Sequence, residues 1–439
     1  MRLAAAILAV AVVAAACASA PAPEDEESVP VTAVEPVEPA PVDVEPPAEV
    51  PPVLILEDVL RLVPGAPVNR AARAAVVRAE ENLSQADLSP NPMLMLGADR
   101  FPLDDLGEGP LRYGIRAYQT IETGGKRSKR AAVGEAGVAT AEWEERIVNL
   151  TIARAAAGAH QEALAADRRV TIRAEAVKAG EELTALVEGL VLAGRERESA
   201  LPPIRARVGR LRLALEDERA RRRRALADLE AVLSLPAGSV EGVKGELLLP
   251  AELPEGAGEG NPSIGKERAA VDVEAARAES ADTGRYPDVR VGLGYEYLDL
   301  LEGGVLNSVG VYLEIPLPFF DRNQGDVRAA VAAARRAEDL TEAERARVAS
   351  EYAMTLSLIG SASANLATWR GSVLPAMARD RELSEAAFDA GRATRNDVLV
   401  AKLAELDASV MAIGEEAKLA ALTLDALALL GRPPADWIR

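Results

Sequence analysis

The chain has 439 residues, a net charge of -19, one histidine and one cysteine. This acidity argues against nucleic-acid binding, which needs a basic face, and one histidine and one cysteine allow neither a Cys/His metal cluster nor an internal disulfide. Aromatic residues make up only 3% of the chain, and the abundance of Ala, Glu, Arg and Leu is typical of long helices.

Residues 1–16 contain one basic side chain followed by an apolar run that is too short to span a bilayer. This pattern predicts a secretory signal peptide. Small residues directly before Cys17 resemble the lipobox of bacterial lipoproteins, which predicts that Cys17 is lipidated and anchors the chain in outer-membrane lipid. The alternative is an ordinary signal peptide cleaved near Ala20, with Cys17 as a bystander. Residues 17–52 are rich in Pro and Glu and predict an acidic tether.

A first set of elements is expected in residues 53–250. Helical patterning in residues 54–88 is broken at Pro64 and Pro67, and strands are expected at about 93–101 and 111–121. In the first strand, Met93, Met95 and Phe101 share one parity. The second strand alternates, with Leu111, Tyr113, Ile115, Ala117 and Ile121 on one parity and Arg112, Gly114 and Arg116 on the other. Long helices are expected to follow at about 126–192 and 202–233.

A second set of elements is expected in residues 251–439. Strands are expected at about 288–299 and 307–315, and helices at about 321–389 and 395–430. One parity of residues 288–299 is apolar, and the other contains Arg290, Gly292, Gly294 and Glu296. Such a strand suits either the wall of a membrane barrel or a sandwich hairpin with one buried face.

Several landmarks recur 195 to 198 residues apart, which indicates a duplicated unit. The segment 73–76 (R-A-A-V) returns at 268–271, and the segment 130–133 (R-A-A-V) returns at 328–331. Ala193-Gly194-Arg195 returns as Ala390-Gly391-Arg392, where each long helix is expected to turn.

Two copies of this unit resemble the TolC-like outer membrane factor family, the exit ducts of Gram-negative efflux and secretion systems. The resemblance covers about residues 53–430. Its two junctions between strand and helix, residues 121–127 (I-E-T-G-G-K-R) and 316–325 (P-L-P-F-F-D-R-N-Q-G), are similar to those of the CzcC-like branch, which serves heavy-metal resistance pumps.

The resemblance implies a mostly helical fold with a membrane β-barrel portion. A homotrimer would share a twelve-stranded barrel and a long periplasmic α-helical tunnel. The chain would be a passive exit duct in the outer membrane of a Gram-negative bacterium, lipid-anchored and reaching into the periplasm. Its cargo would be heavy-metal cations, with drugs as the alternative. A periplasmic adaptor and an inner-membrane transporter of the resistance–nodulation–division type would be its partners.

The resemblance also implies roles for residues at the two helix turns. Gly194, Arg195, Gly391 and Arg392 would contact the adaptor. Asp397 would form an acidic ring at the periplasmic aperture, open to pairing with Arg392 or Arg395. The alternative for Asp397 is a carboxylate in the first turn of a helix that caps the helix and gates nothing.

Three other classes of protein fit the sequence less well than an outer-membrane exit duct. A periplasmic adaptor would have a single helical hairpin, which the duplicated unit argues against. A coiled-coil scaffold lipoprotein would leave the four alternating strands unexplained. An enzyme is disfavoured because Gly124-Gly125-Lys126 lacks the spacing of a P-loop, and His160 is expected to be a surface or packing residue of a helix. No cofactor is predicted.

Overall fold

The computed structural model describes residues 50–99, 112–250, 253–254, 256, 259–300 and 304–438. The chain divides into two units, Met1–Pro46 and Pro47–Arg439, and all described residues lie in the second unit. The expected signal peptide, the lipidation site Cys17 and nearly all of the tether lie outside the described residues. The second unit is mostly helical, as the sequence predicts.

The first part of this unit is dominated by one very long helix. In chain order its elements are β1 (Val53–Leu54), α2 (Leu56–Leu62), α3 (Pro67–Ala86), β2 (Met93–Asp99), β3 (Arg112–Ile121), α4 (Lys126–Leu192), α5 (Leu201–Leu233) and β4 (Gly242–Val243). Because α4 contains 67 residues, it is about 100 Å long at the usual rise of an α-helix. It therefore connects the four-stranded sheet at one of its ends to a tight turn at the other.

The second part has the same order of a helix, two strands, a long helical segment and a returning helix. Its elements are α6 (Pro262–Asp282), β5 (Val289–Leu300), β6 (Gly304–Glu314), α7 (Gln324–Thr368), a π-helical turn (Trp369–Val373), α8 (Leu374–Asp389) and α9 (Arg395–Leu429), followed by a 3-10 turn (Pro434–Ile438).

The long helix expected at about 321–389 is not continuous. It begins at Gln324 and is interrupted by the π-helical turn. Pro375 lies in the first turn of α8, where its ring would clash with the carbonyl of Gly371 in a regular α-helix and where it donates no hydrogen bond. The wider π turn absorbs this conflict.

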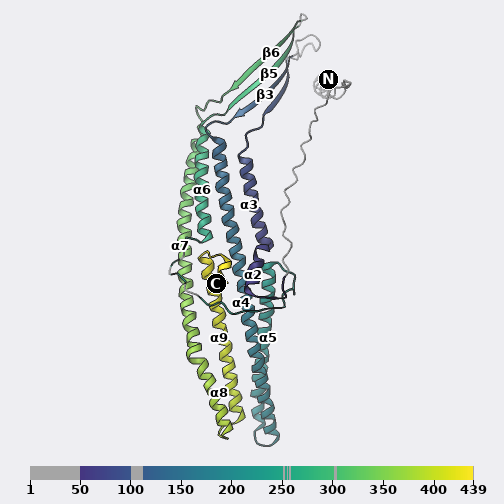
Figure 1. Ribbon diagram of the computed structural model, residues 1–439, viewed down its shortest axis with the longest axis vertical. Helices are drawn as coiled ribbons and strands as arrows, with labels where there is room; N and C mark the ends of the chain where they lie inside the picture. Colours follow the sequence, from purple (N-terminus) through teal and green to yellow (C-terminus); the bar gives the residue numbers. More distant parts are fainter. Residues whose placement is uncertain are drawn as a thin grey trace, which may run out of the picture. The chain divides into compact units, whose positions relative to one another are not determined.

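The helices pack side by side around α4 and α9 (Figure 1). Helix α4 contacts α3, α5, α6 and α9, and α9 contacts α7 and α8. On the inner side of α4, Ala153, Ala156 and Ala157 are fully buried, so their small side chains let neighbouring helices approach closely. Leu229 of α5 and Leu424 of α9 fill the same core. No described helix is both long and apolar enough to cross a bilayer.

A short parallel strand pair, β1 with β4, was missed by the sequence reasoning. Each strand has only two residues, and Val53 pairs with Gly242. His160 of α4 is buried beneath this pair, and its Nε2–H donates to the carbonyl of Leu54 at 3.3 Å. His160 is therefore a packing residue, one of the two roles that the sequence analysis expected. Burial lowers the pKa of His160.

The four longer strands form one antiparallel sheet in the order β2-β3-β5-β6. Strand β3 joins the two halves of the chain, because its Ile115 pairs with Tyr295 of β5. Strands β2 and β6 are the two edges. Among the described residues, each edge strand is paired on one side only, so one row of its backbone N–H and C=O groups has no ladder partner there.

Candidate functional site

The four-stranded sheet has one apolar face, and that face is exposed. Leu96 is 68% exposed, Leu293 62%, Val309 80% and Val311 75%. The register places Ile115 on the same face, opposite Leu96 on one side and Tyr295 on the other. A sandwich hairpin would bury such a face, whereas here its side chains contact no second layer of the described chain.

The residues that strand β2 contributes to the apolar face are not those of the parity named in the sequence analysis. Met93 and Met95 share one parity, as expected, but they lie beside Tyr118 and Arg116 on the polar face. Leu94 and Leu96 occupy the apolar face instead, because they pair with Ala117 and Ile115. Both parities of β2 are apolar. Its sequence alone therefore does not show which set of side chains lies on the apolar face of the sheet.

The opposite face of the sheet has a charged cluster centred on Glu296. Its carboxylate accepts hydrogen bonds from Arg112 at 2.5 Å, from Arg116, and from the hydroxyl of Tyr312 at 3.2 Å. The guanidinium of Arg116 also lies over the Tyr312 ring, 4.8 Å from its centroid. The cluster joins β3, β5 and β6, because its members come from all three strands.

Glycines accompany the tyrosines on this polar face. Tyr118 lies opposite Gly292 in the register, and Gly292 lies opposite Tyr312. A Cβ atom on Gly292 would come within 2.5 Å of the Tyr118 ring, and one on Gly294 within 2.8 Å of the Tyr312 ring. The two rings therefore lie close against the backbone of β5, where only glycine leaves room.

The junction between the sheet and the helices is rigidly bonded. The carboxylate of Asp288, just before β5, accepts from the backbone N–H of Thr123 at 3.2 Å and from Lys126 at 2.8 Å. Gly124 has a φ of +66°, and a Cβ atom there would lie 2.5 Å from the Tyr286 ring. These contacts attach the start of α4 to the start of β5.

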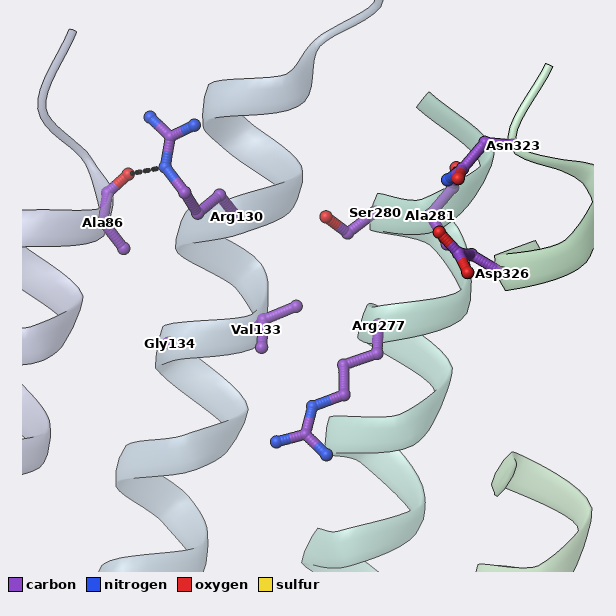
Figure 2. A pocket seen from close by; sticks show the side chains of 9 residues that line it. All are labelled: Ala86, Arg130, Val133, Gly134, Arg277, Ser280, Ala281, Asn323 and Asp326. Atoms are coloured by element: carbon purple, nitrogen blue, oxygen red, sulfur yellow. Dashed lines mark hydrogen bonds between the residues drawn. The ribbon is translucent and has the colours of Figure 1, made fainter. Parts of the chain in front are cut away.

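A pocket opens near this junction (Figure 2), and it is lined by Ala86, Arg130, Val133, Gly134, Arg277, Ser280, Ala281, Asn323 and Asp326. Figure 2 shows Arg130 donating to the carbonyl of Ala86, at 2.6 Å. Arg130 also donates to Glu122 at 2.6 Å, and Arg277 donates to Glu274 at 2.6 Å. The guanidinium groups of both arginines are therefore hydrogen-bonded to other residues of the chain. We interpret the pocket as a gap where helices meet.

At the other end of α4, a glycine ends the helix in a Schellman turn. Gly194 has a φ of +69°. Its N–H donates to the carbonyl of Val191 at 2.9 Å, and the N–H of Arg195 donates to that of Leu190 at 2.9 Å. This pair of bonds needs a left-handed residue at the position of Gly194.

The end of α8 has the same turn. Gly391 has a φ of +68°. Its N–H donates to the carbonyl of Phe388 at 2.9 Å, and the N–H of Arg392 donates to that of Ala387 at 2.8 Å. The predicted tip residues Gly194, Arg195, Gly391 and Arg392 therefore lie at two turns of matching geometry, and both arginines are exposed.

Asp397 lies in the first turn of α9, where it forms a capping box with Thr394. Its carboxylate accepts from the N–H of Thr394 at 2.8 Å and from the Thr394 hydroxyl at 2.7 Å. These bonds lower the pKa of Asp397, the backbone bond most strongly. Within the described chain, Asp397 forms no salt bridge with Arg392 or Arg395, and Arg395 instead lies 5.9 Å from the centroid of the Phe388 ring.

The sequence reasoning missed the cluster around Glu296. Arg112 and Arg116 appeared only as members of a polar parity, and Glu296 lies 180 residues or more beyond them. The available signal was charge alternating with glycine on one parity of two strands. In the described parts of the chain, no three His, Cys, Asp or Glu side chains lie close enough to hold a metal ion.

Comparison with known proteins identifies the family that this sequence resembles. Residues 253–428 match the family model of the outer membrane efflux proteins. The resemblance that the sequence predicts is thereby confirmed: the chain is related to the outer membrane efflux proteins.

Individual relatives can also be named. The chain is 27% identical over 394 residues to the cobalt-zinc-cadmium resistance protein CzcC of Cupriavidus metallidurans, covering 86% of this chain and 90% of that protein. Its fold is similar to that of the Campylobacter jejuni outer membrane channel CmeC, with a TM-score of 0.70, 15% identity and coverage of 86% of this chain and 85% of CmeC. The Vibrio cholerae outer membrane protein VceC gives a TM-score of 0.69 at 16% identity, covering 86% of this chain and 96% of VceC.

Proposed function

We propose that the chain is the outer-membrane exit duct of a tripartite efflux pump. The observation that carries this proposal is the exposed apolar face of the four-stranded sheet, backed by a polar face with a charged cluster. An apolar surface of this kind belongs in lipid, and a polar face belongs in a water-filled lumen. The similarity to outer membrane efflux proteins supports the same conclusion.

The two open edges of the sheet support a homotrimer as part of this proposal. Four strands cannot close a barrel, and unpaired edge groups are too costly to leave in lipid. If β2 of one copy pairs with β6 of the next, three copies close a twelve-stranded barrel and leave no edge. The long helices α4, α5, α7, α8 and α9 would then line a tunnel through the periplasm.

The anchor and the partners are part of the same proposal. Cys17 would bear the lipid that holds the chain in the outer membrane. The turns at Gly194 and Gly391 would contact a periplasmic adaptor, and an inner-membrane transporter of the resistance–nodulation–division type would supply the energy. Both turns present exposed arginines to such a partner, Arg195 and Arg392.

The cargo proposed is a divalent heavy-metal cation. This rests on the similarity to a cobalt-zinc-cadmium resistance protein over most of both chains. A periplasmic adaptor is the alternative function, and the match to the family of outer membrane efflux proteins speaks against it.

Deletion of the gene in its host tests this function. Loss of the duct should make the host more sensitive to cobalt, zinc and cadmium salts, and the unmodified gene on a plasmid should restore growth. A plasmid encoding Arg195→Glu together with Arg392→Glu should fail to restore it, although the protein still reaches the outer membrane. Unchanged metal tolerance of the deletion strain would refute the metal cargo, and full rescue by the double variant would refute adaptor docking at the turns.

A further inference from the structure

We infer that Tyr118 and Tyr312 set the width of the passage at the level of the strands, so that this part of the duct selects by size. The inference rests on the proposed function, because it requires the polar face of the sheet to line a lumen. It assigns Gly292 and Gly294 as the residues that keep the passage wide, since they let the two tyrosine rings lie close against the backbone of β5.

Tyr118 lies close against β5 because its neighbour in the sheet has no side chain. The two residues are paired in the register, and Gly292 is buried. A Cβ atom added to Gly292 would lie 2.5 and 2.7 Å from two atoms of the Tyr118 ring. Such distances are far inside van der Waals contact, so an alanine there must push the ring away from the wall and into the lumen.

Tyr312 also lies close against the sheet, and its contacts come from three directions. A Cβ atom on Gly294 would come within 2.8 Å of its ring, and one on Gly310 within 3.1 Å of its hydroxyl oxygen. The hydroxyl donates to Glu296 at 3.2 Å, and the Arg116 guanidinium covers the ring at 4.8 Å. The charged cluster thus fixes the orientation of the ring.

The two carboxylates described on this face are both paired with arginines. Glu296 accepts from Arg112 and Arg116, and Glu314 pairs with Arg290 at 3.3 Å. Both of these carboxylates therefore have a guanidinium partner, and neither is available as a binding step for a passing cation. Besides the one excess arginine charge, the feature of this face that can discriminate between solutes is the free width, which we infer the tyrosine rings determine.

The register identifies residues on either side of the Tyr118 and Tyr312 rings that can be replaced by cysteine. The rings belong to one row of the sheet, formed by Tyr118, Gly292 and Tyr312. Ser308 pairs with Glu296, between this row and the loop that connects β5 to β6. Thr120 pairs with Arg290, between this row and the helices. Reagents entering from the loop end therefore reach position 308 before the rings and position 120 only after passing them.

The experiment measures which reagents pass the rings. Thr120→Cys and Ser308→Cys are made separately, and intact cells are treated from outside with maleimide-linked polyethylene glycols of increasing size. The chain without an introduced cysteine reports any background from Cys17. Adding Gly292→Ala or Gly294→Ala should abolish labelling at position 120 by the largest reagent that otherwise passes, and should leave labelling at position 308 unchanged.

Matched variants separate a raised ring from a general disturbance of the sheet. Gly114→Ala is the control, because Gly114 lies on the same face in the inner strand β3 and a Cβ atom there meets nothing nearer than 3.7 Å. It should leave the size limit unchanged. Removing the ring in the double variant Gly294→Ala/Tyr312→Ala should restore labelling at position 120. Tyr312→Ala alone should admit a larger reagent, which keeps the idea testable if a glycine variant fails to fold.

The size-limit inference and the barrel proposal fail in different ways. Val309 lies on the apolar face and is 80% exposed in the single chain, so Val309→Cys should resist water-soluble reagents in the membrane. If it reacts as readily as Ser308→Cys, the barrel proposal fails. If the two faces differ but the glycine and tyrosine variants leave the size limit at position 120 unchanged, the barrel stands and the rings do not set the width.

Discussion

At the scale of single residues, Asp397 combines a structural contact with a proposed position at the periplasmic aperture. Asp397→Asn keeps an oxygen that can accept from Thr394 but removes the negative charge. We expect a slightly lower thermal midpoint, because the negative charge stabilises the first turn of α9. We also expect a weaker preference for cations over anions in planar bilayers, because a ring of carboxylates attracts cations.

Thr394→Ala is the matched variant for the capping role of this box. It removes the N-cap hydroxyl and should cost about 0.5–2 kcal/mol of unfolding free energy while the charge of Asp397 is retained. Because the pKa of Asp397 is lowered in the folded chain, its ionised carboxylate stabilises the folded chain at every pH above the ordinary pKa of aspartate. This stabilisation is lost as the pH falls from the ordinary pKa through the lowered one. Unaltered ion preference in Asp397→Asn would leave the carboxylate with the capping role alone.

His160 predicts how stability depends on pH. Burial lowers its pKa below the ordinary value of 6.5. Below pH 6.5, His160 therefore becomes protonated in the unfolded chain while it stays largely neutral in the folded chain. Stability should therefore fall as the pH drops from 7.5 to 5. In His160→Gln, which keeps a donor for Leu54, the thermal midpoint should fall less over the same range. An equal fall in both proteins would rule out His160 as a source of the acid sensitivity.

At the scale of elements, a buried ion pair joins α4 to α5. Arg169 and Glu218 lie 3.0 Å apart, and each side chain is 8% exposed. Arg169→Met would leave Glu218 with Arg221 as its remaining partner, at 3.1 Å, so we expect a loss below the about 3–5 kcal/mol of a fully unpaired buried charge. Arg212→Met is the control, because Arg212 pairs with Glu181 on the surface of the same two helices, where a pair is worth about 0–1 kcal/mol. Chemical denaturation that gave equal losses would show that burial of the first pair has no energetic consequence.

The elements also show what the sequence could and could not predict. Residues 112–117 alternate between charged or glycine positions and apolar or aromatic ones, so a strand with two distinct faces follows from local pattern alone. The pairing of β3 with β5 depends on contacts between distant segments, and for that reason the cluster of Arg116 with Glu296 was not foreseen. Periodicity also fails for β2, where Leu94 and Met95 give both faces the same character. The π turn is caused by Pro375, a residue visible in the sequence whose structural effect was not anticipated.

At the scale of the whole molecule, the two halves of the chain contribute two strands each to one sheet. Neither half buries the apolar face of its strands, and the sheet as a whole has two open edges. The described chain therefore has an exposed apolar surface and two open strand edges. The proposed trimer accounts for both features with one arrangement.

The most direct test of this account is electron microscopy of the full-length protein, purified in detergent from outer membranes. We predict a threefold particle in which β2 of each copy pairs with β6 of the next to close a twelve-stranded barrel, with a helical portion about 100 Å long. In that map, Leu96, Val309 and Val311 should face the detergent, and Tyr118 and Tyr312 should face the lumen. A monomer, or a particle whose sheets pack face to face through their apolar sides, would contradict the account.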